Sequence, residues 1–284
     1  MAMQKKILGL AIFFLIIGFV AYTVAKTSEI SEEAIKNNSI VEVRKAIENG
    51  ADVNVKNEIG TTPLMFAAQC NSLEIAKLLI ENGADVNARN KNGITALELA
   101  VINNKPLEIA KLLIENGADV NVKGIKGSTV LMVVAFNNYL EAARLLIENG
   151  ANVNAKNEAG RTALMSAAQT NSLEIAKLLI EKRADINVKD NESNTALLIA
   201  TMNNHSEVAK LLVKNGADVN AQRKDGYTPL MFAALYNSLE IAKLLIENGA
   251  DVNTKEKNGF TALILTASKG LNEMVTLLKE HGTK

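Results

Sequence analysis

Few residues in this chain carry side chains that could act as nucleophiles, general bases or metal ligands. Cysteine occurs once, at Cys70, and histidine twice, at His205 and His281. A thiolate nucleophile needs a base within hydrogen-bond reach, and a structural zinc site needs about four Cys or His ligands. No histidine lies near Cys70 in the sequence, and neither histidine has cysteines or patterned carboxylates beside it. The sequence therefore predicts no catalytic residue and no metal site.

The motifs of nucleotide-binding and hydrolytic enzymes are also absent from the sequence. It contains no P-loop, no dinucleotide-binding fingerprint, no G-x-S-x-G and no H-E-x-x-H. Aspartates such as Asp52 and Asp85 recur at a regular interval. Such regularity indicates a turn that every repeat needs, and a catalytic pair is a poor explanation for it. We expect no enzyme activity, no cofactor and no small-molecule substrate.

Composition favours a folded protein that does not bind nucleic acid. The 284 residues include 31 basic and 31 acidic side chains, so no general attraction to phosphate is expected. Tryptophan is absent and aromatic residues make up only 4%, which argues against a platform for stacking bases. The hydrophobic fraction of 48% is ample for a core.

A repeat of 33 residues organises the chain. The segment N-G-A-D-V-N or a close variant of it begins at Asn49, Asn82, Asn116, Asn149, Lys182, Asn215 and Asn248. The spacing is 33 residues except for one interval of 34, which contains residues 103–106. We interpret the extra residue as a loop insertion between helices.

Each repeat contains signals for two short helices. A threonine, which is a good N-cap, precedes a short apolar stretch in every repeat. A second helix is predicted over residues 73–82, where Ile75, Leu78 and Leu79 have helical spacing. Gly83 and its equivalents suit the left-handed position that ends this helix, and a polar turn or short hairpin follows. The threonines are Thr62, Thr95, Thr129, Thr162, Thr195, Thr228 and Thr261.

A 33-residue helix–turn–helix unit with T-P-L-x-x-A and G-A-D-V-N closely resembles the ankyrin repeat. The resemblance covers about residues 28–282 and recurs seven times after a partial first unit. It implies an all-α solenoid of helix–turn–helix units with hairpin-like turns. The histidine of the family's T-P-L-H motif is absent, so any hydrogen bond that it makes must be missing or replaced. The residues in its place are Met65, Glu98, Met132, Met165, Leu198, Met231 and Ile264.

Polar substitutions in the first and last units indicate the ends of one stack. A terminal repeat has a neighbour on one side only, so its other face can be polar. Positions that are aliphatic in internal repeats are Glu42 and Lys45 in the first unit, and Asn272 and Lys279 in the last. We therefore expect residues 27–284 to form a single solenoid of about eight units.

The repeat over residues 184–216 departs from the pattern at two turns. Arg183 stands where other repeats have the glycine that ends the second helix, and Ser193 replaces the turn glycine. A positive φ costs a non-glycine residue about 1 kcal/mol or more. We expect this repeat to be the least stable internal one.

Residues 1–26 have the pattern of a targeting segment. Two lysines precede an uncharged, mostly apolar run over residues 7–25, which predicts an N-terminal hydrophobic helix. The run nearly matches the roughly 20 residues that span a bilayer, and the lysines predict a cytoplasmic N-terminus with the repeats exported. Residues 23–25 form a passable cleavage site. An uncleaved membrane anchor, a cleaved signal peptide and a buried soluble helix all remain open.

The resemblance also implies where a partner would bind. In ankyrin-like folds, the turn tips and the exposed side of the first helix form a concave binding surface. Variable positions there carry apolar or aromatic side chains, which serve as anchors in protein contacts. Neutral drift at positions free of packing constraints would produce the same variation. The predicted partner-binding residues are Ile102, Phe136, Met202, Tyr227, Leu235, Tyr236 and Phe260.

Three functions agree with these patterns. The leading hypothesis is a non-enzymatic protein-interaction scaffold in the cell envelope, tethered by a membrane helix at residues 7–25. The alternatives are a secreted, cleaved protein that acts on a host or external target, and a periplasmic protective or stress protein. We expect a protein partner of unknown identity and no binding of nucleic acid.

Overall fold

The computed structural model describes residues 29–102, 106–267 and 269–282. These residues form two compact units, one ending at Asp119 and the other beginning at Val120. Within the described ranges, regular structure is helical, and the β pairing is one isolated bridge between Lys123 and Thr129. The all-α prediction is confirmed for these residues. The predicted hydrophobic helix lies outside them.

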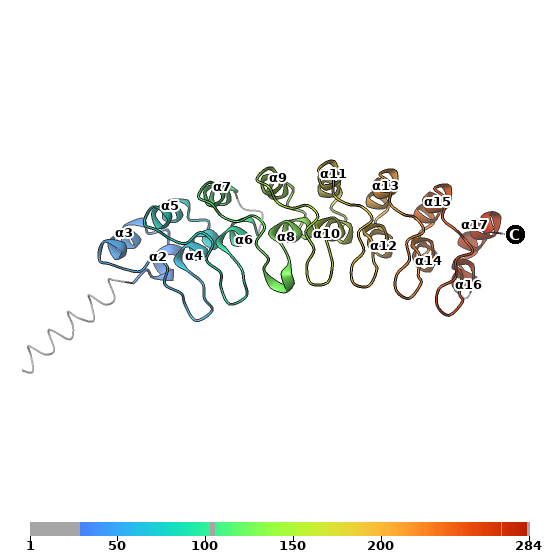
Figure 1. The fold of residues 1–284 in the computed structure, drawn as a ribbon, viewed down its shortest axis with the longest axis horizontal. Coiled ribbons are helices and arrows are strands. Elements are labelled where there is room, and N and C mark those ends of the chain that lie inside the picture. The colour runs from blue at the N-terminus through green and yellow to red at the C-terminus, as the bar shows by residue number, and fades with distance from the viewer. Residues whose placement is uncertain (1–28, 103–105, 268, 283–284) are drawn as a thin grey trace, which may run out of the picture. The chain divides into compact units, whose positions relative to one another are not determined.

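Each unit is built from helix pairs, with the first helices in one layer and the second helices in another (Figure 1). Within a unit, first helices pack against first helices of adjacent repeats, and second helices against second helices. The first unit contains α2 (Glu32–Lys36), α3 (Ile40–Glu48), α4 (Pro63–Cys70), α5 (Leu73–Glu81), α6 (Ala96–Val101) and α7 (Glu108–Glu115). The second unit contains η1 (Ile125–Gly127), α8 (Val130–Phe136), α9 (Leu140–Glu148), α10 (Ala163–Gln169), α11 (Leu173–Glu181), α12 (Ala196–Met202), α13 (Ser206–Lys214), α14 (Pro229–Leu235), α15 (Leu239–Glu247), α16 (Ala262–Ala267) and α17 (Asn272–Gly282).

Threonines begin the first helices, as predicted. Thr62 has extended backbone angles, and its Oγ1 accepts a hydrogen bond of 3.3 Å from the backbone N–H of Met65. The same bond begins α6, α8, α10, α12 and α14. It satisfies one of the N–H groups that a helix start leaves without a partner. Gly83 follows α5 with a φ of 86°, as predicted for a left-handed helix end.

The position of the missing motif histidine lies in the core. Met65, Met165 and Met231 are each 1% exposed. A flexible thioether fills space between helices without requiring a hydrogen-bond partner. Apolar packing therefore occupies the position of the motif histidine in these repeats.

Glu98 places a carboxyl group at this core position in α6, where it is only 8% exposed. Burial raises the pKa of Glu98, and the charge of Arg89 opposes that rise. As the pH rises, Glu98 therefore loses its proton at a lower pH in the unfolded chain than in the folded protein. Above the folded-state pKa, the folded protein carries a buried negative charge, which lowers its free energy of unfolding.

We expect Glu98→Met to stabilise the first unit more at pH 7 than at pH 4. Urea unfolding at both pH values measures this, with Glu58→Met at an exposed turn as the control. An equal gain at both pH values would contradict it.

An asparagine in each repeat links it to the next. In the second unit, Nδ2 of Asn220 donates to the carbonyl of Gly249 at 3.1 Å, and its Oδ1 accepts from the N–H of Asp251 at 2.8 Å. Asn54 makes the same pair of bonds with Gly83 and Asp85 in the first unit. This asparagine ladder also includes Asn87, Asn121, Asn154 and Asn187. The final residue of the A-D-V-N segment is therefore an inter-repeat contact.

Adjacent hairpin turns also touch within each unit. The N–H of Lys257 donates to the carbonyl of Asp225 at 3.1 Å, and that of Lys224 to Glu192 at 3.1 Å. Gly226 has a φ of 88°, and a Cβ placed on it would lie 2.9 Å from the Cα of Glu256. This turn glycine is needed both for its backbone conformation and for the close approach of the next turn.

Arg183 and Ser193 adopt the conformations that the pattern required of glycine. Their φ angles are 64° and 62°. The ladder bond from Asn154 to the Arg183 carbonyl is 3.3 Å long, compared with 3.0 Å from Asn187 to Gly216.

We expect Arg183→Gly to stabilise the second unit by about 1 kcal/mol, because glycine removes the strain of a positive φ. Hydrogen exchange should show residues 184–216 as the least protected internal repeat and slower exchange there in the variant. Protection equal to that of neighbouring repeats would contradict the expectation.

The predicted polar end positions are exposed, but the last repeat also exposes apolar groups. Glu42 and Lys45 in α3 and Asn272 and Lys279 in α17 all face solvent. Ile264, however, is 45% exposed in α16, although its equivalents elsewhere are buried. The polar positions predicted in the second helix of this repeat are thus exposed, and the exposure of Ile264 in its first helix is an additional observation.

Candidate protein-interaction surface

Of the residues with catalytic potential, His205 contacts the neighbouring repeat. Nδ1 of His205 lies 2.9 Å from the carbonyl oxygen of Ala168 in the preceding repeat. Ser72, at the equivalent position of another repeat, donates its Oγ to the carbonyl of Ile35 at 3.2 Å. Cys70 is a partly buried free thiol at the end of α4. No group of three or more His, Cys, Asp or Glu that could hold a metal occurs among the described residues.

The candidate partner-binding residues of the second unit lie on what we call the hairpin-side surface. It consists of the hairpin turns of residues 120–282 and the faces of α8, α10, α12, α14 and α16 beside them (Figure 1). Four of the predicted residues come together there around Phe232. Met202, Tyr227 and Leu235 pack against the cluster of Leu198, Ala221 and Phe232, and the Tyr236 ring stacks on Phe232.

The aromatic cluster consists of Met202, Tyr227, Phe232, Leu235 and Tyr236. The Tyr227 and Phe232 ring centroids are 5.3 Å apart, and those of Phe232 and Tyr236 are 6.4 Å apart with nearly parallel planes. Phe232 is 6% exposed whereas Tyr236 is 55% exposed. The buried Phe232 ring therefore restricts the motion of the exposed Tyr236 ring. Because this apolar surface is already ordered, binding a partner to it costs little further conformational entropy.

Arg223 holds the hairpin against this cluster. Its guanidinium carbon lies 5.6 Å from the centroid of the Phe232 ring, within the range of a cation–π contact. Its Nη2 is 3.2 Å from a carboxylate oxygen of Asp225. The charge of Arg223 is thus paired on one side and rests on an aromatic face on the other.

Phe136 lies apart from the aromatic cluster, beside a pocket of about 290 Å³. The pocket is lined by Val133, Phe136, Arg161 and Gln169 among others, and Phe136 is 48% exposed. Nη2 of Arg161 donates to Oε1 of Gln169. The Arg161 side chain thus extends from the turn along α10 and forms one wall of the pocket.

Two other predicted residues do not join these groups. Ile102 is the C-cap of α6 in the first unit, where it is partly buried. Phe260 is 45% exposed and follows the turn before α16, without a ring contact within the described residues. The structure therefore gathers four of the seven predicted residues into one cluster.

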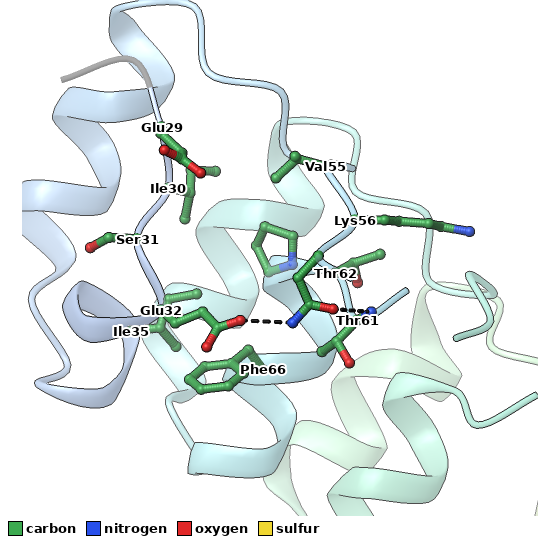
Figure 2. A pocket seen from close by; sticks show the side chains of 12 residues that line it. Glu29, Ile30, Ser31, Glu32, Ile35, Val55, Lys56, Thr61, Thr62 and Phe66 are labelled. Carbon is green, nitrogen blue, oxygen red and sulfur yellow. Dashed lines mark hydrogen bonds between the residues drawn. The ribbon is translucent and has the colours of Figure 1, made fainter. Parts of the chain in front are cut away.

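A second pocket, of about 340 Å³, lies in the first unit beside α2 (Figure 2). Ile30, Ile35 and Phe66 are among its lining residues, and Oε1 of Glu32 accepts a hydrogen bond of 2.8 Å from Asn57. α2 begins at Glu32, although the 33-residue spacing from Pro63 would place its first residue at Ile30. The pocket occupies the space beside this shortened helix start.

A comparison with protein-family models agrees with this architecture. The model described as ankyrin repeats (3 copies) matches residues 32–124, 122–190 and 188–256. The chain belongs to the ankyrin repeat family. A comparison with curated proteins gives no match. Ankyrin repeats bind protein partners and typically act as scaffolds without catalytic activity, so this chain is a protein-interaction scaffold.

Phe232 and Arg223 were not predicted from the sequence of this ankyrin repeat array, and Arg161 and Gln169 occupy predicted surface positions but were not among the predicted partner-binding residues. Phe232 was not predicted because the equivalent residue of another repeat, Phe66, is also phenylalanine, so this position was not recognised as variable between repeats. That position, four residues after the threonine, is Val133 and Ser166 in other repeats. This variation was the available signal.

None of the helices in the described parts of the chain is long and apolar enough to cross a membrane. Residues 7–25, where a membrane helix was predicted, lie outside those parts.

Proposed function

We propose that this ankyrin repeat protein holds a protein partner on the hairpin-side surface of residues 120–282, with the aromatic cluster as the main contact. The observation that carries the proposal is the stack of exposed Tyr236 on buried Phe232, with Tyr227 beside it. Aromatic side chains held in place by their neighbours dominate the binding energy of many protein interfaces. Partly exposed Met202 and Leu235 extend the same apolar area.

Changing Tyr236 to serine tests this proposal with little risk to the fold. Tyr236 is the C-cap of α14 and more than half exposed, so its removal leaves the buried ring of Phe232 in place. We expect Tyr236→Ser to weaken partner binding at least about tenfold, as for loss of an aromatic hot spot. Quantitative mass spectrometry of proteins captured on the immobilised chain measures this.

The matched control is Val41→Ser. Val41 is an apolar residue of α3 that is 74% exposed and belongs to the second-helix layer of the first unit. A specific partner should be retained by Val41→Ser and depleted by Tyr236→Ser. Equal capture by both variants would overturn the proposed surface, although the fold would be unaffected.

We further propose that residues 7–25 anchor the chain in a membrane, with the repeats exported. The support is the uncharged apolar run after two lysines. N-terminal sequencing of the protein from membrane fractions tests it. An intact N-terminus in the carbonate-resistant fraction is expected, whereas a mature chain that begins at Lys26 would show a cleaved signal peptide and a secreted protein. Such a product would remove the anchor from the proposal and leave partner binding untouched.

A further inference from the structure

Arg161 carries a charge that the described residues leave without a counter-ion. No carboxylate in residues 29–102, 106–267 and 269–282 lies within ion-pair distance of it. Its Nε is shielded from solvent and has no hydrogen-bond acceptor in the same ranges. Gln169 supplies a neutral acceptor to Nη2. Because a guanidinium stays charged at all relevant pH values, a partly desolvated one without a counter-ion favours an anionic ligand.

Arg223 lies on the same surface but has a counter-ion within the described residues. Its Nε, like that of Arg161, has no hydrogen-bond acceptor in the described residues, but its Nη2 pairs with Asp225 and its guanidinium lies over the ring of Phe232. Arg161 has a pocket of about 290 Å³ in front of it instead of a carboxylate. The difference between the two arginines indicates a position that an external acid completes.

The surroundings of Arg161 indicate which acid fits. Phe136 and Val133 form an apolar wall, and Asn137, Ser128 and Gln169 offer neutral polar groups. A planar carboxylate matches the fork of donors on a guanidinium, and an aliphatic stem would contact the phenyl ring. The side chain of a glutamate or aspartate in a polypeptide has both features.

The aromatic cluster lies two repeats further along the same surface. α10, which carries Gln169, packs against α12, and α12 packs against α14. Packed helices lie about 8–10 Å apart, so the two sites are separated by roughly 16–20 Å. An extended chain advances about 3.3 Å per residue, so about five or six residues bridge that distance.

Building on the proposed function, we infer that the partner presents an extended acidic segment to this surface. One of its carboxylates pairs with Arg161 in the pocket beside Phe136. About five or six residues away, an aromatic or leucine side chain of the segment packs on Tyr236 and Leu235. The surface therefore selects for an acidic residue and an apolar residue at a fixed spacing, in addition to apolar contact area.

Selection from a random 12-residue peptide library on the full-length chain in detergent micelles tests the inference. We expect enriched peptides to combine Asp or Glu with an aromatic residue or leucine at that spacing. For the most enriched peptide, fluorescence anisotropy should show affinity about tenfold weaker for Arg161→Gln. An amide in place of the peptide's carboxylate should weaken binding equally, and the two changes together should cause no further loss.

Arg144→Gln is the matched control, because Arg144 is an exposed arginine of α9 in the other helix layer. Circular dichroism melting of both variants checks that each is folded. Peptides that lose affinity with Tyr236→Ser but not with Arg161→Gln would overturn this inference and leave the proposed function standing. Peptides unaffected by either change would overturn both. Failure to enrich any peptide would overturn the inference alone, because a folded partner could still use the surface.

Discussion

Gly226→Ala is expected to destabilise residues 120–282 by about 3 kcal/mol, through backbone strain and overpacking together. The strain arises because φ is 88° at this residue. The overpacking arises because the added methyl group would lie 2.9 Å from the Cα of Glu256 and 3.1 Å from the amide nitrogen of Lys257. Both are backbone atoms, which cannot move aside as the end of a flexible side chain can. The turn that carries Arg223 and Tyr227 would have to move away from its neighbour.

Gly249→Ala separates the two causes. Gly249 has nearly the same φ, 87°, but a Cβ there would meet no atom within 4 Å. We expect it to cost only about 1 kcal/mol, from strain alone. Chemical denaturation of both variants measures the difference, and hydrogen exchange at Lys257 reports the bond to Asp225. Equal destabilisation by the two variants would show that contact between turns contributes nothing.

Asn220→Ala is expected to destabilise the second unit by about 2 kcal/mol, from the loss of two hydrogen bonds. The side chain joins one repeat to two backbone groups of the next, the Gly249 carbonyl and the Asp251 N–H. Because both bonds cross between repeats, the loss should weaken coupling between neighbours more than the repeats themselves. Denaturation should therefore become less cooperative as well as occur at lower denaturant.

Asn253 provides the control for this change at the equivalent position of the last repeat. Its side chain makes no hydrogen bond within the described part of the chain. Asn253→Ala should be close to neutral. A similar cost for Asn220→Ala and Asn253→Ala would exclude the ladder as a source of stability.

Local features of each repeat could be predicted because they depend on one residue type and its backbone. Thr62 begins a helix wherever the chain folds, since its side chain bonds within its own first turn. Gly83 and Arg183 both adopt a positive φ because the helix must end in the same way at each. Repetition strengthens such signals, because seven copies report on the same requirement.

The candidate site was only partly predictable because it depends on contacts between side chains. Tyr236 was found as an exposed variable residue, but the ring of Phe232 beneath it was not. The pairing of Arg161 with Gln169 joins residues that are eight positions apart, and neither is apolar. Variable apolar residues therefore indicate the aromatic part of the surface but not its charged residue, Arg161.

The asparagine ladder also bears on how such a chain can change in length. Residues 62–87 and 228–253 are identical except at Gln69-Cys70 and Leu235-Tyr236. Most repeats contact the next through the same Asn side chain and a Gly carbonyl, with Arg183 in place of the glycine at one of these contacts. After duplication or deletion of a block of 33 residues, the repeats on either side could therefore form the same kind of inter-repeat hydrogen bonds. Copying such a block would carry its variable side chains intact to a new place, so gene duplication can rearrange what this protein recognises without redesigning how it is joined.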